Sequence, residues 1–208
     1  MRVKVCGLTS YEDAVLALDQ DVDALGFNFF PRSPRYIRPE EARAIIRRLP
    51  PFTTTVGLFV NVSNPAELAE SARYAGVQVL QLHGDESPDY CRQLSDWILV
   101  KAIRIGQNLA PEPLADYPAR AFLLDAKDDV FFGGTGRTFD WSLAEGIKKL
   151  RPIILAGGLH AANIGDAIRT VQPYGVDVCS GVESGPGKKD PAKLREFMNE
   201  VRNVIQNR

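Results

Sequence analysis

The sequence has too few cysteines and histidines for a disulfide-stabilised scaffold or a metal cluster. Its 208 residues include two histidines and three widely spaced cysteines, Cys6, Cys91 and Cys179. An odd count without a CxxC pair does not fit a disulfide framework or a structural zinc site. Sparse cysteine of this kind is typical of a reducing compartment, so we expect a cytoplasmic protein.

A large net charge and long apolar runs are also lacking. The chain carries 25 Lys and Arg against 26 Asp and Glu, a formal net charge of −1. This balance does not favour nucleic acid or a membrane surface as a partner. No apolar run approaches the ~20 residues of a membrane-spanning helix. The N-terminus shows no basic stretch followed by an apolar core, so we expect no secretory signal.

What the sequence contains is an alternation of strand-like and helix-like segments. Helical patterns with capping residues cover 10–20, 38–49, 64–76 and 190–205. Strands that alternate with helices form parallel βαβ units, and eight such units predict a single (β/α)8 TIM barrel domain over residues 1–208. The eight strand-like runs are VKVC (3–6), ALGFNF (24–29), TVGLFV (55–60), VLQL (79–82), ILVKAI (98–103), AFLLD (121–125), IILA (153–156) and VDVCS (176–180).

The competing architecture is an open doubly wound sheet. It is less favoured because no Gly-x-Gly-x-x-Gly turn follows the first strand. The segment 104–120 holds three prolines, so we expect the fifth helix of the barrel to be short or missing. We find no linker, low-complexity tract or second domain.

Polar residues and glycines collect where the predicted strands end, which is the face of a (β/α)8 barrel that carries the active site. Glycine turns after the last two strands suit a phosphate, because backbone N–H groups must approach it closely. The candidate site residues are Cys6, Arg35 in a proline-braced loop, His83, Asp125, Gly157, Gly158, Asp177, Ser180 and Gly181.

Most of these residues also have a purely structural interpretation. Cys6 fits a small buried hydrophobe, Asp125 fits a loop cap, and Arg35 fits a solvated arginine. The residues alone leave both interpretations open. We interpret Cys91 and Cys179 as packing residues.

A set of motifs, in order and at matching spacing along the chain, resembles phosphoribosylanthranilate isomerase of tryptophan biosynthesis. The motifs are VCGLT, GFNFFPRSPRYI, LQLHGDE, LLDAK followed by GGTGRTFDW, LAGGL, and VDVCSGVESGPGKKD, and they run from residue 3 to about 190. AGGL also occurs in other phosphate-binding barrels. The combination of CG, PRSPRYI, GGTGRTFDW and SGVESGPGKKD is specific to this family.

The resemblance implies an Amadori rearrangement of N-(5-phosphoribosyl)anthranilate to 1-(2-carboxyphenylamino)-1-deoxyribulose 5-phosphate, in which an aminoaldose becomes an aminoketose. It implies that Cys6 is the general base for the C2 proton. It implies that Asp125 is the general acid that protonates the ring oxygen. The rearrangement needs no external oxidant, so we expect neither a metal nor a cofactor.

The resemblance also implies the binding residues. Arg35 would bind the anthranilate end, and the segment 133–141 would form a mobile loop over the site. The only partner expected is the small-molecule substrate, and the chain would be a monomer or a homodimer. His83 and Asp177 match the family's positions that line the sugar site. The family's phosphate-binding positions correspond to Gly157, Gly158, Ser180 and Gly181.

This division of labour sets demands on protonation. A free thiol titrates near ~8.5 and a free aspartate near ~3.9. A working site must therefore lower the pKa of the thiol and raise that of the carboxyl, or run on the minor species of each. Lys4 lies on the same strand face as Cys6, and its ammonium would favour the thiolate. Burial would favour the protonated form of Asp125.

Other functions stay open. An indole-glycerol-phosphate synthase would need a catalytic lysine and glutamate on the early strands. The related isomerase of histidine synthesis would need aspartates on strands 1 and 5, and strand 1 offers Cys6 instead. A phosphate-ligand sensor on a retained barrel would lose the acid or the base, and both are present. A scaffold protein would give no reason for polar residues to collect at strand ends.

Overall fold

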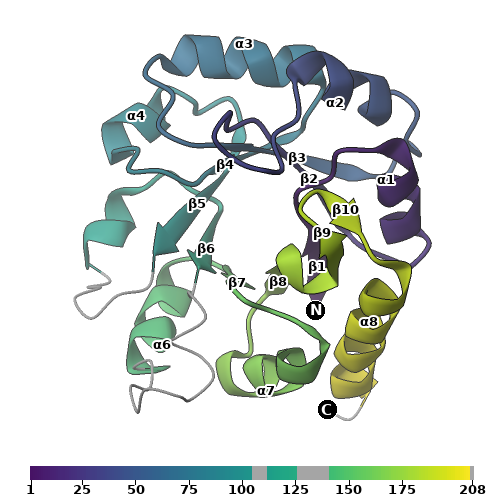
Figure 1. The fold of residues 1–208 in the computed structure, drawn as a ribbon. Coiled ribbons are helices and arrows are strands. Elements are labelled where there is room, and N and C mark those ends of the chain that lie inside the picture. The colour runs from purple at the N-terminus through teal and green to yellow at the C-terminus, as the bar shows by residue number, and fades with distance from the viewer. Residues whose placement is uncertain (105–111, 126–140, 207–208) are drawn as a thin grey trace.

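Eight parallel strands form a closed barrel in this computed structural model, which describes residues 1–104, 112–125 and 141–206. Each strand pairs with the next along the chain, and β8 closes the ring on β1 (Figure 1). The predicted (β/α)8 barrel is therefore confirmed. The strands are β1 (Arg2–Val5), β2 (Ala24–Asn28), β3 (Thr54–Phe59), β4 (Val79–Leu82), β5 (Ile98–Arg104), β6 (Ala121–Asp125), β7 (Ile153–Ala156) and β8 (Gly175–Val178).

Helices surround the barrel on its outside (Figure 1). Within the described residues, the connection from β5 to β6 holds only the 3-10 helix η1 (Glu112–Asp116), in agreement with the predicted short or missing fifth helix. After β8 come η2 (Ser180–Val182) and the hairpin of β9 (Glu183–Gly185) and β10 (Lys188–Lys189). The α-helices are α1 (Tyr11–Leu18), α2 (Pro39–Ile46), α3 (Pro65–Ala75), α4 (Pro88–Arg92), α6 (Trp141–Leu150), α7 (Ala161–Val171) and α8 (Pro191–Gln206).

Local capping residues set the helix boundaries. The Ser10 side chain accepts a hydrogen bond from the N–H of Asp13 at 3.1 Å and begins α1. Asn64 begins α3 by accepting from the N–H of Ala66 at 2.9 Å, and Gly76 ends it with a φ of +86°. Each cap satisfies an orphan backbone group of the helix terminus. No helix in the described part of the chain combines the length and apolar character that crossing a membrane requires.

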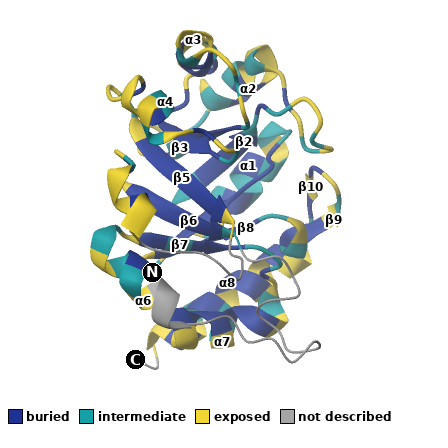
Figure 2. Cartoon of the chain, turned by 90° about the vertical axis from the view of Figure 1, so that its left-hand side faces the viewer, coloured by how far each residue is buried: buried dark blue, intermediate teal, exposed yellow. Residues whose placement is uncertain are grey.

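The barrel strands are largely buried on both faces, and the exposed residues lie mainly on the outer helices and loops (Figure 2). Val3 and Val5 belong to the large apolar core between the strands and helices. Lys4 between them faces the barrel interior instead. Because a slip of one residue would exchange these faces, the apolar pattern determines which side chains point toward the barrel axis.

Four strands end earlier than the sequence predicts. β2 and β3 each end one residue early, at Asn28 and Phe59, and the other two are the first and the eighth strands. The first was expected to include Cys6 and ends at Val5, and the eighth was expected to reach Ser180 and ends at Val178. The chain leaves the sheet at these points because Gly7 has a φ of +75° and Cys179 has a φ of −133° with a ψ of −87°. Cys6 and Cys179 are thus the first residues after two neighbouring strands.

Candidate active site

A cavity of about 200 Å³ lies at the carboxyl ends of the strands. Of the predicted site residues, only Gly181 is not part of its lining, although its neighbour Ser180 is. Residues 133–140 of the predicted mobile loop lie outside the described residues. The predicted residues that line the cavity are Cys6, Arg35, His83, Asp125, Gly157, Gly158, Asp177 and Ser180, and the lining also includes Gln81 and Cys179.

Cys6 is buried beside a second thiol and two ammonium groups. A hydrogen bond with Cys179 and the positive charges of Lys4 and Lys189 lower the pKa of the Cys6 thiol well below its usual range, although burial opposes this shift. A Cβ built on Gly26 would lie 3.0 Å from both Cys6 Sγ and Lys4 Cε. Lys4 and Cys6 therefore share one strand face, as the sequence predicts.

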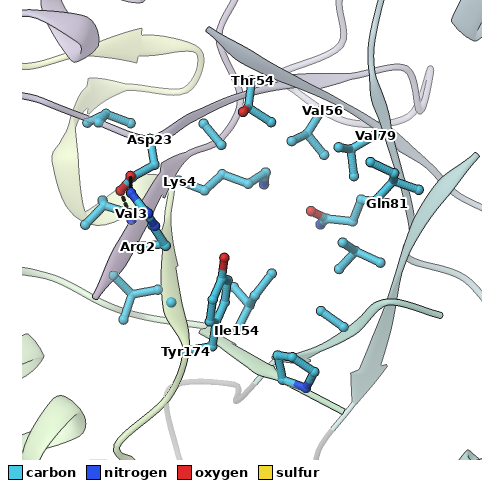
Figure 3. Close-up of a pocket in the computed structure, with 18 of the residues that line it drawn as sticks. Arg2, Val3, Lys4, Asp23, Thr54, Val56, Val79, Gln81, Ile154 and Tyr174 are labelled. Atoms are coloured by element: carbon cyan, nitrogen blue, oxygen red, sulfur yellow. Dashed lines mark hydrogen bonds and ion pairs between the residues drawn. The ribbon is translucent and has the colours of Figure 1, made fainter. Parts of the chain in front are cut away.

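Lys4 is held by a buried ion pair. Its Nζ donates to Asp177 Oδ2 at 2.8 Å, and Figure 3 shows Lys4 pointing into the barrel. Burial alone would lower the pKa of Lys4, but attraction to Asp177 and Cys6 outweighs burial and raises it. Burial raises the pKa of Asp177 to about 6 against the attraction of Lys4. Asp177 Oδ1 is buried and has no hydrogen-bond partner among the described residues.

Asp125 and His83 form a hydrogen-bonded pair at the cavity. His83 Nε2 lies 3.0 Å from Asp125 Oδ2, and His83 Nδ1 lies 3.0 Å from Gln81 Nε2. The side chain of Asp125 is 30% exposed, so burial is weaker than the sequence suggests. When Gln81 donates to Nδ1, the Nε2–H donates to the carboxylate. The opposite arrangement, with a protonated Asp125 donating to Nε2, requires an acceptor at Nδ1, which a rotated Gln81 amide supplies.

Arg35 lines the cavity and forms an ion pair with Glu183 of the same chain. Its Nε and Nη2 donate to the Glu183 carboxylate, with Nη2 and Oε2 2.6 Å apart. Lys189 Nζ donates to Glu183 Oε1 at 2.8 Å and to the carbonyl of Cys6 at 2.6 Å. Burial opposes ionisation of Glu183, but these two cations lower its pKa. Sequence reasoning missed Glu183 and Lys189, although both lie in the motif SGVESGPGKKD.

Two loops rich in glycine meet above β7 and β8. Gly157 and Gly158 have φ values of +91° and +58°, which glycine adopts without steric cost. A Cβ on Gly181 would lie 1.9 Å from the carbonyl oxygen of Leu159. Only glycine therefore allows the η2 segment to approach the loop after β7 this closely.

A larger cavity of about 820 Å³ lies at the opposite, amino-terminal end of the barrel (Figure 3). Val56 and Val79 are part of its apolar lining. Its lining also includes Phe52, which is 99% exposed, and the exposed residues Ile98 and Tyr174. Apart from Gln81, none of the residues that line the first cavity takes part in lining this one.

A closed (β/α)8 barrel with an activated thiol, a carboxylate and glycine turns at its strand ends defines an enzyme of the TIM-barrel class. The family model described as N-(5'phosphoribosyl)anthranilate (PRA) isomerase matches residues 3–200. A relative named N-(5'-phosphoribosyl)anthranilate isomerase, from Pelobacter propionicus, is 50% identical over 198 residues, which are 95% of this chain and 94% of the relative. The chain belongs to this family of isomerases, which serves tryptophan biosynthesis.

Solved structures of the family agree with the barrel. Phosphoribosyl anthranilate isomerase from Thermotoga maritima has a TM-score of 0.87 and 40% identity, covering 98% of this chain and 99% of that one. A structure in complex with reduced 1-(o-carboxyphenylamino)-1-deoxyribulose 5-phosphate has a TM-score of 0.86 and 38% identity, with the same coverage. A third structure shows monomers generated from the dimeric T. maritima enzyme, with a TM-score of 0.84, 36% identity and coverage of 97% and 98%.

Proposed function

We propose that this chain converts N-(5-phosphoribosyl)anthranilate to 1-(2-carboxyphenylamino)-1-deoxyribulose 5-phosphate by an Amadori rearrangement. The observation that carries the proposal is that an activated thiol and a carboxyl group, Cys6 and Asp125, face one cavity from different strands. The solved complex with the reduced product analogue supports the same substrate class. Because the rearrangement moves hydrogen within one molecule, it calls for no external oxidant, metal or cofactor.

Cys6 acts as the general base. After the ribose ring opens to a protonated imine, the thiolate removes the C2 proton and leaves an enolamine, which tautomerises to the ketone. The low pKa of Cys6 keeps the thiolate populated at neutral pH. The ammonium groups of Lys4 and Lys189 favour the thiolate by balancing its charge.

Asp125 acts as the general acid and protonates the ring oxygen as the C–O bond opens. Its hydrogen bond with His83 holds the carboxyl group in one orientation. A proton on Asp125 is compatible with this contact when Gln81 turns its amide oxygen toward His83. His83 thus positions the acid and lines the sugar site, and it takes no proton from the substrate.

The substrate's two anionic ends suit the two sides of the cavity. Arg35 binds the anthranilate carboxylate, and Glu183 fixes the guanidinium in the orientation that receives it. At the other end, backbone N–H groups of the glycine turns hold the phosphate. Asp177 Oδ1 accepts a hydrogen bond from a sugar hydroxyl. The phosphate cradle consists of Gly157, Gly158, Ser180 and Gly181.

We further propose that the chain is a cytoplasmic, single-domain protein that forms a homodimer. The T. maritima relative is described as dimeric. On this chain, the amino-terminal cavity is bordered by the exposed apolar side chains of Phe52, Ile98 and Tyr174. Exposed apolar side chains that gather at one face are typical of a protein–protein contact. A two-fold axis through that face leaves both active sites open.

The decisive experiment follows the loss of N-(5-phosphoribosyl)anthranilate fluorescence with the purified protein. We expect turnover in the parent and a loss of kcat of about 10²–10⁴-fold in Cys6→Ala and in Asp125→Ala. Cys91→Ala removes a buried thiol of α4 that is not part of the cavity lining. It is the matched control and should keep the parent rate.

Other outcomes point to other functions. Turnover that survives Cys6→Ala removes the thiol as the essential base. A folded parent without turnover contradicts the proposed isomerase and leads to assays with other sugar phosphates. Tight phosphate-ligand binding without any turnover would favour a sensor.

A further inference from the structure

Cys6 and Cys179 lie opposite each other at the ends of neighbouring strands. In the pairing of β1 with β8, Lys4 is opposite Asp177, and the N–H of Cys6 donates to the carbonyl of Val178 at 2.9 Å. Residues two apart on a strand share a face. The cysteines therefore follow the buried Lys4–Asp177 pair on the inner face, one layer nearer the cavity.

The two thiols line the same cavity. They lie close enough for each to shift the pKa of the other. A Cβ on Gly7 would lie 3.0 Å from Cys179 Sγ, so this sulfur sits against the residue that follows Cys6. Paired strands lie about 4.8 Å apart, which is within the Cα separation of about 4.4–6.8 Å that a disulfide spans. Neighbouring strands are thus close enough for a disulfide to span them.

The pair is chemically asymmetric. The charges of Lys4 and Lys189 favour the thiolate at Cys6. The hydrogen bond to Cys6 and burial raise the pKa of Cys179, so Cys179 keeps its proton. Glu183 Oε1 lies 3.7 Å from Cys179 Sγ and adds negative charge on that side. One sulfur is thus a nucleophile and its neighbour is a thiol placed to react second.

We propose that Cys6 and Cys179 are a redox-active dithiol that reacts with hydroperoxides and closes to a reversible disulfide. A small oxidant fits the cavity of about 200 Å³ that both residues line. The arrangement of a low-pKa thiolate beside a second, resolving cysteine is the one that protects a thiol from irreversible oxidation.

The chemistry balances in two steps. The Cys6 thiolate attacks one oxygen of hydrogen peroxide, the O–O bond breaks, and hydroxide leaves while Cys6 becomes a sulfenic acid. Cys179 then loses its proton, and its sulfur attacks Cys6 Sγ. The S–O bond breaks, and the departing hydroxide combines with that proton to form water. Two thiols are oxidised, and one peroxide is reduced.

The disulfide has a consequence for activity that rests on the proposed function. Once bonded to Cys179, Cys6 can no longer accept the C2 proton, so the isomerase would stop until a thiol reductant restores it. The dithiol itself does not depend on that role, because its formation is measured by mass.

Cys91 provides an internal reference for ordinary thiol chemistry. It is buried in the apolar core, and burial raises its pKa to about 11. We therefore expect Cys6 to be oxidised at least about ten-fold faster than Cys91, since thiolate is the reactive form.

The test exposes the fully reduced protein to stoichiometric hydrogen peroxide. Catalase stops the reaction, free thiols are alkylated in denaturant, and the products are identified by intact mass and peptide mapping. We expect the parent and Cys91→Ala to lose the mass of two hydrogen atoms and to yield a Cys6–Cys179 linked peptide. Cys179→Ala should instead accumulate a sulfenic acid on Cys6, which dimedone traps.

The proposal is overturned if Cys6 proceeds to a sulfinic acid while Cys179 stays reduced, if neither cysteine changes, or if the parent and Cys179→Ala give the same products. Activity is followed in parallel, before and after dithiothreitol. A linked peptide together with a reversible loss of turnover supports both the dithiol and the role of Cys6 as the base of the isomerase. Linked peptide with undiminished turnover supports the dithiol and contradicts the role of Cys6 as base.

Discussion

Cys6 owes its proposed chemistry to its neighbours and not to exposure to water. Burial by itself would keep the thiol protonated, and the hydrogen bond from Cys179 together with the ammonium groups of Lys4 and Lys189 reverses that preference. Lys4 is buried in its pair with Asp177, so the charge of its ammonium acts on Cys6 with little screening by salt. The interaction with Cys179, together with the two ammonium groups, makes a thiol at this position suitable as a base.

Replacing Lys4 therefore changes the pH dependence of the reaction. The base must be deprotonated, so kcat/KM rises with pH through the pKa of Cys6. Lys4→Met removes an ammonium that stabilises the thiolate, which raises this pKa and moves the acidic limb to higher pH. The limb is measured from kcat/KM and from the rate of Cys6 alkylation by iodoacetamide. Lys188→Met, an exposed lysine on β10, is the control, and an unmoved limb in Lys4→Met would count against the role of Lys4.

The pairing of His83 with Asp125 makes a prediction about coupling. If His83 acts only by holding Asp125, His83→Ala should lower kcat with a smaller effect on KM. The double variant should then be no slower than Asp125→Ala alone, because the two residues act as one unit. Independent, multiplicative losses in kcat would show that His83 acts on the substrate by itself.

Local patterns in the sequence were enough to predict the strands, the helix caps and eight cavity residues, because a strand end in a (β/α)8 barrel always faces the same rim. Contacts between distant residues were not predictable in this way. Cys179, interpreted as packing, meets Cys6 only because the last strand closes onto the first in a particular register. Arg35 and Glu183, 148 residues apart, depend on the same closure. One local signal did indicate that Cys179 faces inward, because it follows Asp177 by two residues and residues two apart on a strand share a face.

At the scale of elements, the loops after β7 and β8 function as one unit. The carbonyl of Leu159 and the backbone of Gly181 approach so closely that a methyl group between them must push the loops apart. The phosphate cradle proposed here depends on that approach, since its N–H groups come from both loops.

Gly181→Ala should therefore cost both stability and binding. We expect a loss of about 1–3 kcal/mol in the free energy of unfolding from overpacking, together with a higher KM and weaker inhibition by inorganic phosphate. Urea titration and steady-state kinetics measure the two effects. Gly185→Ala on β9 is the matched control, because nothing lies within 4 Å of its added Cβ, and it should stay within about ±0.5 kcal/mol. Equal behaviour of the two variants would contradict the close approach.

At the scale of the whole molecule, the barrel separates two tasks onto opposite ends. The carboxyl ends of the strands carry the smaller cavity, and the amino ends carry the larger one, whose lining combines apolar side chains with Arg2, Lys4 and Asp23 (Figure 3). Lys4 lines the larger cavity, and its partner Asp177 lines the smaller one. This buried pair therefore connects the interior of the amino-terminal cavity with the floor of the proposed active site.

The proposed dimer is a prediction about that amino-terminal face. Phe52 is almost fully exposed at its rim, and an aromatic side chain buries about 150–250 Å² in a contact. Phe52→Asp would place a charge in the interface on both copies, because a two-fold contact uses the same patch twice. Light scattering after size exclusion should give the mass of two chains for the parent and of one chain for Phe52→Asp. Tyr74→Ser, which changes an exposed aromatic residue on α3, should leave the dimer intact. A parent that runs as a single chain at micromolar concentration would contradict the dimer, and a Phe52→Asp variant that stays dimeric would place the contact elsewhere.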